Sequence, residues 1–247
     1  MKAAVILPAA GLGTRMGRAS AETTGTSRKQ FMLLDGSPVL AHTIRKFLSS
    51  DRVSEIVVAV RRDDLEWVGQ LLRDLAAECG SRIAVRAVEG GNSRQESVEN
   101  AFAALDPDTP LVAVHDAVRP FIEIETIAKV IDEAGEHGAA IVAIVPVDTV
   151  KQVSGAQASG AKVRATISRE RLVLAQTPQV FRYSLLRTAF DAARRDGFTG
   201  TDESSLVERL ESVEVSVVLG SDRNIKITRP GDMQVARLYL EQETART

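Results

Sequence analysis

The chain of 247 residues contains one cysteine, Cys79. A single cysteine excludes an intrachain disulfide and a metal site built from several thiolates, and it fits a reducing compartment. No run reaches the roughly 18 consecutive apolar residues of a membrane-spanning helix. The apolar start, residues 1–10, lacks the basic beginning and the length of a signal peptide. We therefore expect a soluble, cytoplasmic protein without a membrane partner, in which Cys79 packs in the core.

The chain also lacks an excess of charge of either sign. Its 31 Lys and Arg residues oppose 33 Asp and Glu residues, which leaves a formal net charge of −2. Such a balance creates no field that would hold a polyanion, so affinity for phosphate must come from a few locally placed cations. We therefore expect no nucleic-acid partner.

Short apolar runs and amphipathic stretches alternate along the chain. Runs rich in Val, Ile and Ala, typical of parallel strands that are buried on both faces, occur at 3–7, 56–60, 83–88, 111–114 and 139–145. This alternation predicts an α/β fold with a doubly wound, mostly parallel sheet sandwiched by helices. The length fits a single domain over residues 1–247.

Helix and strand signals continue along the chain. Ser37-Pro38 predicts an N-cap followed by a first-turn proline, and Ser93 to Glu96 predicts a capping box. Further helices are expected over 184–195 and 202–210 and after Pro230. Strands are expected at 213–219 and 225–228.

The alternation breaks after Val145. Two strand-like pieces, 149–153 and 162–167, flank the Gly- and Ala-containing residues 155–160, which suit a hairpin tip. An isolated hairpin is at best marginally stable. We therefore expect residues 147–170 to form an extended arm that packs on a second copy of the chain.

The first predicted strand ends in a turn of small residues, Pro8-Ala9-Ala10-Gly11-Leu12-Gly13-Thr14-Arg15-Met16-Gly17. Open α/β sheets bind ligands at such strand ends. A dinucleotide fingerprint would need glycine at Met16, and a Walker A loop would need Gly-Lys-Ser/Thr, so both are disfavoured. The cations that follow suit a triphosphate, although a solvated loop would carry the same residues: Arg15, Arg18, Arg28 and Lys29.

Four more polar clusters stand at predicted strand ends: Gly90 to Ser97, His115 to Pro120, Thr177-Pro178-Gln179 and Asn224 to Pro230. Each alone has a structural explanation, such as Ser93 as a helix cap, Asp116 as a loop acceptor or Arg119 as a surface ion pair. His115 is expected to be a structural hydrogen-bonding residue. Their convergence on one edge of the sheet predicts a site.

These clusters, together with Lys29-Gln30, Asp148 to Lys151 and Thr201-Asp202-Glu203, resemble the 2-C-methyl-D-erythritol 4-phosphate cytidylyltransferases in order and nearly end to end. The resemblance implies a Rossmann-like nucleotidyltransferase fold. It also implies magnesium-dependent transfer of CMP from CTP to a sugar-alcohol phosphate, on the non-mevalonate route to isoprenoids. A homodimer that exchanges its β-hairpin arms is implied as well.

The resemblance further implies roles for individual residues. Catalytic roles fall to Arg15, Lys29, Arg169 and Lys226. Contacts to the nucleotide fall to Ala9, Ala10, Gly11, Gly13, Gly91, Asn92, Ser97 and Asp116. Contacts to the acceptor fall to Arg119, Thr149, Arg169, Thr177 and Thr201, with Thr149 and Arg169 reaching across the dimer. The chain departs from the family pattern at Arg28, where proline is common, at Asn92, where aspartate is frequent, and in a longer loop before Arg28.

Nucleotidyl transfer needs in-line geometry and cations that stabilise charge on phosphorus oxygens. The acceptor phosphate, with a second pKa of about 6, is mostly a dianion at neutral pH and needs no general base. Magnesium would bridge the phosphates, with Asp116 as the best-placed carboxylate, directly or through water, and Asp202 and Glu203 as alternatives. Two other functions compete: a ribitol 5-phosphate cytidylyltransferase, which differs in its acceptor, and a non-catalytic nucleotide-binding module, which would lack some of these cations.

Overall fold

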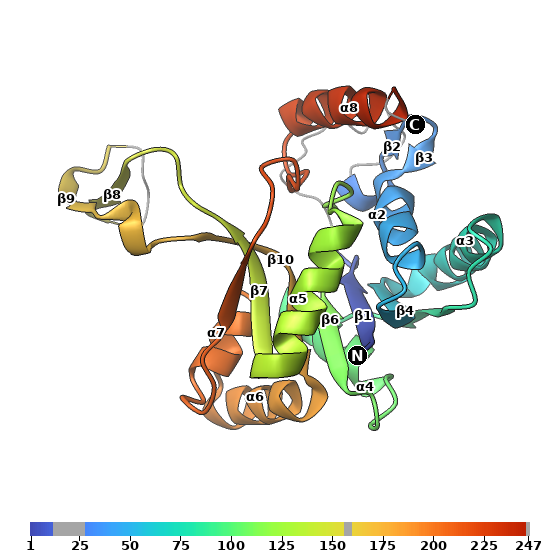
Figure 1. Cartoon of the computed structure of the whole chain (residues 1–247), viewed down its shortest axis with the longest axis horizontal. Coiled ribbons are helices and arrows are strands. Elements are labelled where there is room, and N and C mark those ends of the chain that lie inside the picture. The colour runs from blue at the N-terminus through green and yellow to red at the C-terminus, as the bar shows by residue number, and fades with distance from the viewer. Residues whose placement is uncertain (12–27, 156–159, 246–247) are drawn as a thin grey trace.

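The main sheet has seven strands, one of which is antiparallel to the rest. The computed structural model describes residues 1–11, 28–155 and 160–245. The strand order is β11-β7-β10-β6-β1-β4-β5, and within it β10 runs antiparallel to β6 and β7 (Figure 1). The strands are β1 (Ala3–Pro8), β4 (Val53–Val60), β5 (Ala84–Glu89), β6 (Leu111–Val114), β7 (Ala139–Ile144), β10 (Leu174–Arg182) and β11 (Ser216–Leu219). The predicted mostly parallel sheet is confirmed.

Helices cover both faces of this sheet. One face carries α2 (Val39–Leu48), α3 (Leu65–Glu78) and α5 (Ile124–His137), and the other carries α4 (Arg94–Ala103), α6 (Tyr183–Asp196) and α7 (Glu203–Glu208). Val5 and Leu7 of β1 pack toward the first group, and Ala4 and Ile6 pack toward the second. Because successive side chains of a strand point to opposite faces, fully apolar strands need cover on both sides. The predicted sandwich is confirmed.

A third, smaller core lies beside the sheet. It packs α8 (Pro230–Thr244) against β2 (Leu33–Leu34), the first residue of α2 and the loop after β6. The short helix η2 (Lys29–Phe31) precedes β2, which pairs with β3 (Ser37–Pro38). The buried side chains of this core include Leu34, Val39, Phe121 and Met233. Pro230 occupies the first turn of α8, as predicted.

Two helix starts, those of α2 and α4, differ in detail from the prediction. Pro38 has ψ 143°, outside the helical region, so α2 begins at Val39 and the expected Ser37 cap was wrong. Ser93 does cap α4, since its Oγ accepts from the N–H of Glu96 at 3.0 Å. The Glu96 carboxylate, however, accepts from the N–H of Asn92 at 2.7 Å rather than from Ser93. The predicted capping box is therefore incomplete: Ser93 caps the helix, but the Glu96 side chain bonds one residue earlier, at Asn92.

Three other expectations were wrong. Residues 225–228 are not a strand, although Ile227 donates its N–H to the Val118 carbonyl at 3.0 Å. Strand β10 was not predicted, because its middle is polar, and the pairing with β7 is irregular between Ala175 and Gln179. Cys79 is exposed at the C-cap of α3 instead of packing in the core.

The predicted hairpin is present as a separate two-stranded sheet. Strand β8 (Val150–Val153) pairs antiparallel with β9 (Val163–Ile167), and residues 156–159 of its tip lie outside the described residues. Figure 1 shows this hairpin projecting away from the main sheet, beyond the ends of β7 and β10. Large apolar side chains are exposed along it, with Val147 at 78% and Val163 at 62%.

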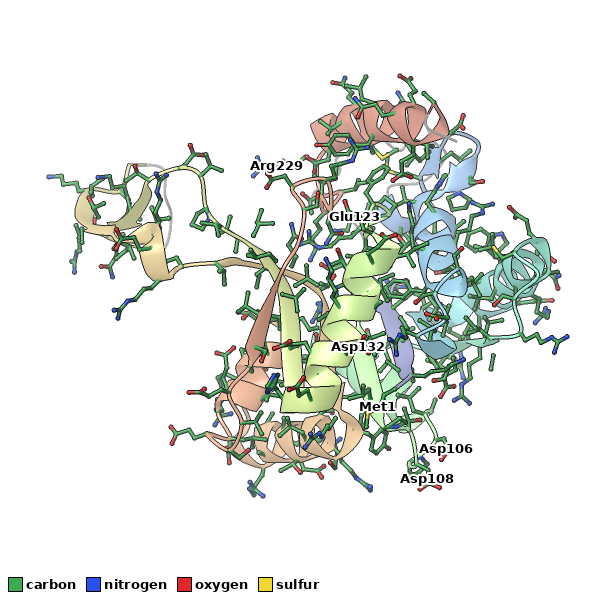
Figure 2. All side chains as sticks on the ribbon, in the orientation of Figure 1. Met1, Asp106, Asp108, Glu123, Asp132 and Arg229 are labelled. Atoms are coloured by element: carbon green, nitrogen blue, oxygen red, sulfur yellow. The ribbon has the colours of Figure 1, made fainter. Side chains whose placement is uncertain are left out.

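Labelled residues mark the two ends of the sheet. Figure 2 shows Arg229 and Glu123 at the end where the parallel strands finish, and Met1, Asp106 and Asp108 at the opposite end. Among the helices in the described part of the chain, none combines the length and apolar character needed to cross a membrane.

Candidate active site

A cavity of about 310 Å³ opens at the carboxyl ends of the parallel strands. It lies where the strand order reverses between β1 and β6, the position at which doubly wound sheets bind ligands. Its lining comes from the turn after β1, from η2, from the start of α4, from the loop after β6 and from the segment before α8: Pro8, Ala9, Ala10, Gly11, Lys29, Gln30, Gly91, Asn92, Ser93, Arg94, Ser97, Asp116, Ala117, Val118 and Lys226.

Small residues let the turn after β1 approach the start of α4. A Cβ on Gly90 would stand 2.6 Å from the Ala10 Cβ, and one on Gly91 would stand 2.2 Å from the Glu96 Cβ. Both are shorter than any real contact, so these positions require glycine. The buried Ser97 hydroxyl fixes the loop by accepting from the Gly91 N–H at 3.0 Å and donating to the Ser93 carbonyl at 2.8 Å. This wall of the cavity is therefore rigid and lined by backbone.

Asp116 is the centre of charge on the cavity floor. Its Oδ2 lies 2.9 Å from Lys226 Nζ and 3.1 Å from Arg119 Nε, and its Oδ1 lies 3.7 Å from Arg94 Nε. Burial opposes ionisation, but the three cations outweigh it and hold the pKa of Asp116 well below its usual range. The carboxylate is therefore charged at any physiological pH.

The guanidinium of Arg94 is held from behind by a buried carboxylate. Its Nη1 and Nη2 donate to the two oxygens of Glu203, the first residue of α7, at 2.7 and 2.9 Å. Burial raises the pKa of Glu203 more than the Arg94 charge lowers it. Glu203 is only 1% exposed, so the pair is locked in one bidentate geometry. The three cations of this cluster outnumber its two carboxyl groups, Asp116 and Glu203, beside the cavity.

The segment that carries Lys226 is tied to β10 through Asn224. The Asn224 side chain donates from Nδ2 to Gln176 Oε1 at 2.9 Å and to the Thr177 carbonyl at 3.0 Å. Its own carbonyl accepts from Arg119 Nη1 at 2.7 Å. These bonds fix the backbone two residues before Lys226, which places the ammonium beside Asp116.

His115 lies beneath this floor and is fully buried. Its Nε2 contacts the Arg119 carbonyl at 3.1 Å, and its Nδ1 contacts the Thr177 hydroxyl at 3.1 Å. Burial lowers the pKa of His115 to about 4, so the ring is neutral at pH 7. Because a carbonyl only accepts, Nε2 carries the proton and Nδ1 accepts from Thr177. The Thr177 oxygen in turn accepts from the Asp116 N–H at 3.0 Å, so His115 is a structural residue, as expected.

The buried neutral histidine predicts a pH-dependent loss of stability. The folded pKa of about 4 lies below the ordinary histidine value of 6.5, so the unfolded chain binds the proton more readily and stability falls as pH drops between these values. Lowering the pH from about 7 to about 5 should reduce the unfolding free energy by about 2 kcal/mol through His115. Urea denaturation at both pH values should show a smaller loss for His115→Gln. The exposed His137→Gln is the control and should keep the wild-type loss; an equal loss in His115→Gln would contradict the prediction.

Comparison with known proteins agrees with this geometry. The chain matches the family described as IspD, 2-C-methyl-D-erythritol 4-phosphate cytidylyltransferase, over residues 3–242. The chain belongs to this family. It is similar to members from Solibacter usitatus, 64% identical over 100% of this chain and 99% of that one, and from Acidobacterium capsulatum, 51% identical over 100% of both. A solved 4-diphosphocytidyl-2C-methyl-D-erythritol synthase from Anaerococcus prevotii, 29% identical, superposes with a TM-score of 0.80 over 97% of this chain and 96% of that one.

Several residues assigned from the cytidylyltransferase resemblance line the cavity: Ala9, Ala10, Gly11, Lys29, Gly91, Asn92, Ser97, Asp116 and Lys226. Arg119 and Thr177 stand directly behind Asp116. Gly13 and Arg15 lie outside the described residues. Thr201 is exposed just before α7, and Thr149 and Arg169 are exposed at the hairpin, so these three do not line the cavity of their own chain.

Two side chains of this cytidylyltransferase site were missed from the sequence. Arg94 lies within the quoted cluster Gly90 to Ser97, and Gln30 follows Lys29, yet neither was assigned a role. An arginine in the first turn of a helix, next to a glycine-rich turn, was the available signal for Arg94. Its buried partner Glu203 is 109 residues away and gave no local signal.

Proposed function

We propose that the protein transfers CMP from CTP to 2-C-methyl-D-erythritol 4-phosphate, giving 4-diphosphocytidyl-2-C-methyl-D-erythritol and pyrophosphate. The observation that carries the proposal is the cluster of Lys226, Arg94 and Arg119 around Asp116 at the strand-end cavity, in a chain that belongs to the cytidylyltransferase family. The reaction belongs to the synthesis of isoprenoid precursors by the non-mevalonate pathway. This cavity binds anions because its side chains leave a net positive charge beside small residues and backbone N–H groups.

The nucleoside end of CTP is assigned to the wall of small residues. The short side chains of Ala9, Ala10 and Gly91 allow a flat base and ribose to approach the backbone closely. Asn92 and Ser97, which line the same wall, offer polar groups to the base. Gly11 ends the described part of this turn. Gly13, outside the described residues, is assigned to the nucleotide as well. Asp116 is assigned to the ribose end of the cavity.

The chemical step is in-line attack by the acceptor phosphate on the α-phosphorus of CTP. One acceptor oxygen forms the new P–O bond, and the bond from the α-phosphorus to the bridging oxygen breaks, so pyrophosphate leaves with that electron pair. Lys29 and Arg15 are assigned to charge on the α-phosphate and the departing pyrophosphate, and Lys226 to the junction of donor and acceptor phosphates. Arg119, Thr177 and Thr201 are assigned to the acceptor side. No general base is required, because the acceptor phosphate is already a dianion.

A divalent ion, Mg²⁺ or a similar hard cation, is proposed to accompany the triphosphate. The described residues include no group of three or more His, Cys, Asp or Glu side chains able to hold a metal. One charged carboxylate does face the cavity, with Asp116 Oδ1 beyond hydrogen-bond distance of Arg94. This fits an ion held mainly by substrate phosphates and water, with Asp116 as its protein ligand, directly or through water. Bound there, the ion would neutralise phosphate charge.

The alternative carboxylates are committed elsewhere. Asp202 caps α7, because its Oδ1 accepts from the Ser205 N–H at 3.1 Å, and its Oδ2 accepts from Gln179 at 2.7 Å. Glu203 holds Arg94. The two alternative metal carboxylates, Asp202 and Glu203, are therefore disfavoured.

The acceptor site is proposed to be completed by a second copy of the chain. Arg169, in η4 (Arg169–Arg171), and Thr149 flank the exposed hairpin and lie away from the cavity of their own chain. The exposed apolar residues of residues 147–170 support packing of this arm on a partner, since Val147, Val163 and Ile167 otherwise face water. A homodimer would thus supply Thr149 and Arg169 to the partner's cavity. A cytoplasmic location, expected from the single cysteine, stays a prediction.

Substrate choice provides the direct test. Pyrophosphate release should be far faster with CTP than with GTP, UTP or ATP, and faster with methylerythritol phosphate than with ribitol 5-phosphate. Excess chelator should abolish it, and added Mg²⁺ should restore it. Preference for ribitol 5-phosphate would identify the alternative enzyme, and CTP binding without turnover would identify a non-catalytic module. Equal turnover with GTP, or full activity in chelator, would contradict the proposal.

A further inference from the structure

Lys29 lies between two residues whose side chains are both anchored to the body of the protein. On one side, Arg28 Nη1 donates to Asp64 Oδ2. Asp64 precedes α3 and is only 6% exposed, yet its carboxylate makes no capping bond to that helix. A buried carboxylate needs a compensating partner, and here that partner is the arginine next to Lys29.

Aromatic packing holds the same short helix from a second direction. The Arg28 guanidinium lies over the Phe31 ring, 4.9 Å from its centroid. Phe31 makes an edge contact with Trp67 of α3 at a centroid distance of 4.9 Å. Contacts among Arg28, Phe31 and Trp67 therefore join η2 to α3, in addition to the ion pair with Asp64.

On the other side of Lys29, Gln30 joins η2 to the glycine turn. Its Nε2 donates to the Ala9 carbonyl at 2.7 Å and to the Gly11 carbonyl at 2.9 Å, and the residue is only 3% exposed. The backbone of Lys29 is thus fixed on both sides, once to α3 and once to the turn after β1. The side chain of Lys29 lines the cavity.

We propose that Arg28 and Asp64 are positioning residues that hold Lys29 where its ammonium meets the transferring phosphates. The inference rests on the proposed function, which assigns Lys29 to the charge that develops on those phosphates. A lysine ammonium is a compact charge on a flexible stem, so the stem must start from a fixed backbone to deliver that charge in one place. Loss of the anchor leaves the ammonium present but misplaced, which weakens stabilisation of the transition state more than ground-state binding.

A double-mutant cycle with Lys29 tests this role. Asp64→Asn keeps the size of the side chain and removes its charge. It should lower kcat about tenfold with little change in KM for the acceptor. In a Lys29→Ala background, the same substitution should change kcat by less than about twofold, because the group it positions is already absent. Pyrophosphate release and thermal unfolding of all four proteins provide the measurements.

A matched control separates this effect from general loss of an ion pair on α3. Glu78, at the other end of α3, pairs with Arg45 at 3.1 Å far from the cavity lining, so Glu78→Gln should leave kcat within about twofold of wild type. Arg28→Gln tests the same anchor from its more exposed partner if Asp64→Asn does not fold.

Three other outcomes would overturn the inference, and the measured kcat values distinguish them. Equal losses of kcat with and without Lys29 would assign the anchor a purely structural role. Normal kcat in both Asp64→Asn and Arg28→Gln, with a strongly impaired Lys29→Ala, would overturn the anchor and leave the proposed function intact. A Lys29→Ala enzyme with near-normal kcat would remove the assigned role of Lys29 and this inference with it.

Discussion

Replacing Lys226 by alanine should lower kcat by about a hundredfold or more without unfolding the protein. The lysine lines the cavity and is held 2.9 Å from the buried, charged Asp116. Its removal takes one preorganised positive charge from the place where negative charge develops during transfer. Folding should persist because Asp116 keeps two other cations, Arg94 and Arg119. Rates of pyrophosphate release and a thermal unfolding curve would measure both effects.

A second lysine provides the control. Lys46 of α2 also pairs with a carboxylate, Glu243, at 3.0 Å, but it does not line the cavity. Lys46→Ala should therefore keep kcat within about twofold of wild type. A Lys226→Ala enzyme with a similarly small change would show that this lysine only balances the charge of Asp116 and does not act on the phosphates. The proposed roles of the phosphate cations would then need to rest on Arg15 and Lys29 alone.

The parallel part of the fold could be predicted because its sequence signal is local. Strands β1, β6 and β7 are apolar runs and β4 and β5 are rich in Val and Ala, and each lies within three residues of its predicted bounds. The hairpin was also predicted, from two short strands around a tip of small residues. In each case the residues that fix the element are adjacent in the chain.

Strand β10 could not be predicted in the same way. Its middle residues, Gln176 to Gln179, are polar and include Pro178, which argues against a central strand. They are buried in the sheet because their partners are distant: Thr177 meets His115 and Asp116, and Gln179 meets Asp202. Conversely, residues 225–228 have a strand-like composition but no strand beside them. Tertiary contacts decided both cases.

The candidate site shows the same difference between local and long-range signals. Polar clusters at strand ends predicted which edge carries the site, because parallel strands bring their carboxyl ends to one edge. The nine predicted residues that line the cavity were assigned by the family resemblance. Neither Arg94's partner Glu203 nor Arg28's partner Asp64 could be predicted, since each pair joins residues far apart in sequence. Arg28 was first noted as one of the cations that suit a triphosphate and as a departure from the family's usual proline. The structure gives that arginine a partner, a buried carboxylate on the scaffold.

Two variants that are each inactive, Arg169→Ala and Lys226→Ala, should regain activity when they are mixed. Arg169 is exposed beside the hairpin, where it donates to the Val147 carbonyl, and it does not line the cavity of its own chain. If it serves the partner's cavity, Arg169→Ala and Lys226→Ala damage different halves of one composite site. A mixed dimer then has one cavity with both residues intact. Random exchange of equal amounts should therefore restore about a quarter of the wild-type rate.

Subunit exchange and a matched mixture make this test decisive. Native mass spectrometry of mass-labelled chains should show mixed dimers before the rate of pyrophosphate release is measured. Mixing Arg169→Ala with the double variant Arg169→Ala/Lys226→Ala should restore nothing, because no mixed dimer of that pair contains an intact site. An isolated hairpin of four- and five-residue strands has too little apolar surface to hold its own position, so the arm must find its order on another surface. Confirmed exchange without regained turnover would show that this surface is not the partner's active site and that one chain builds the whole site.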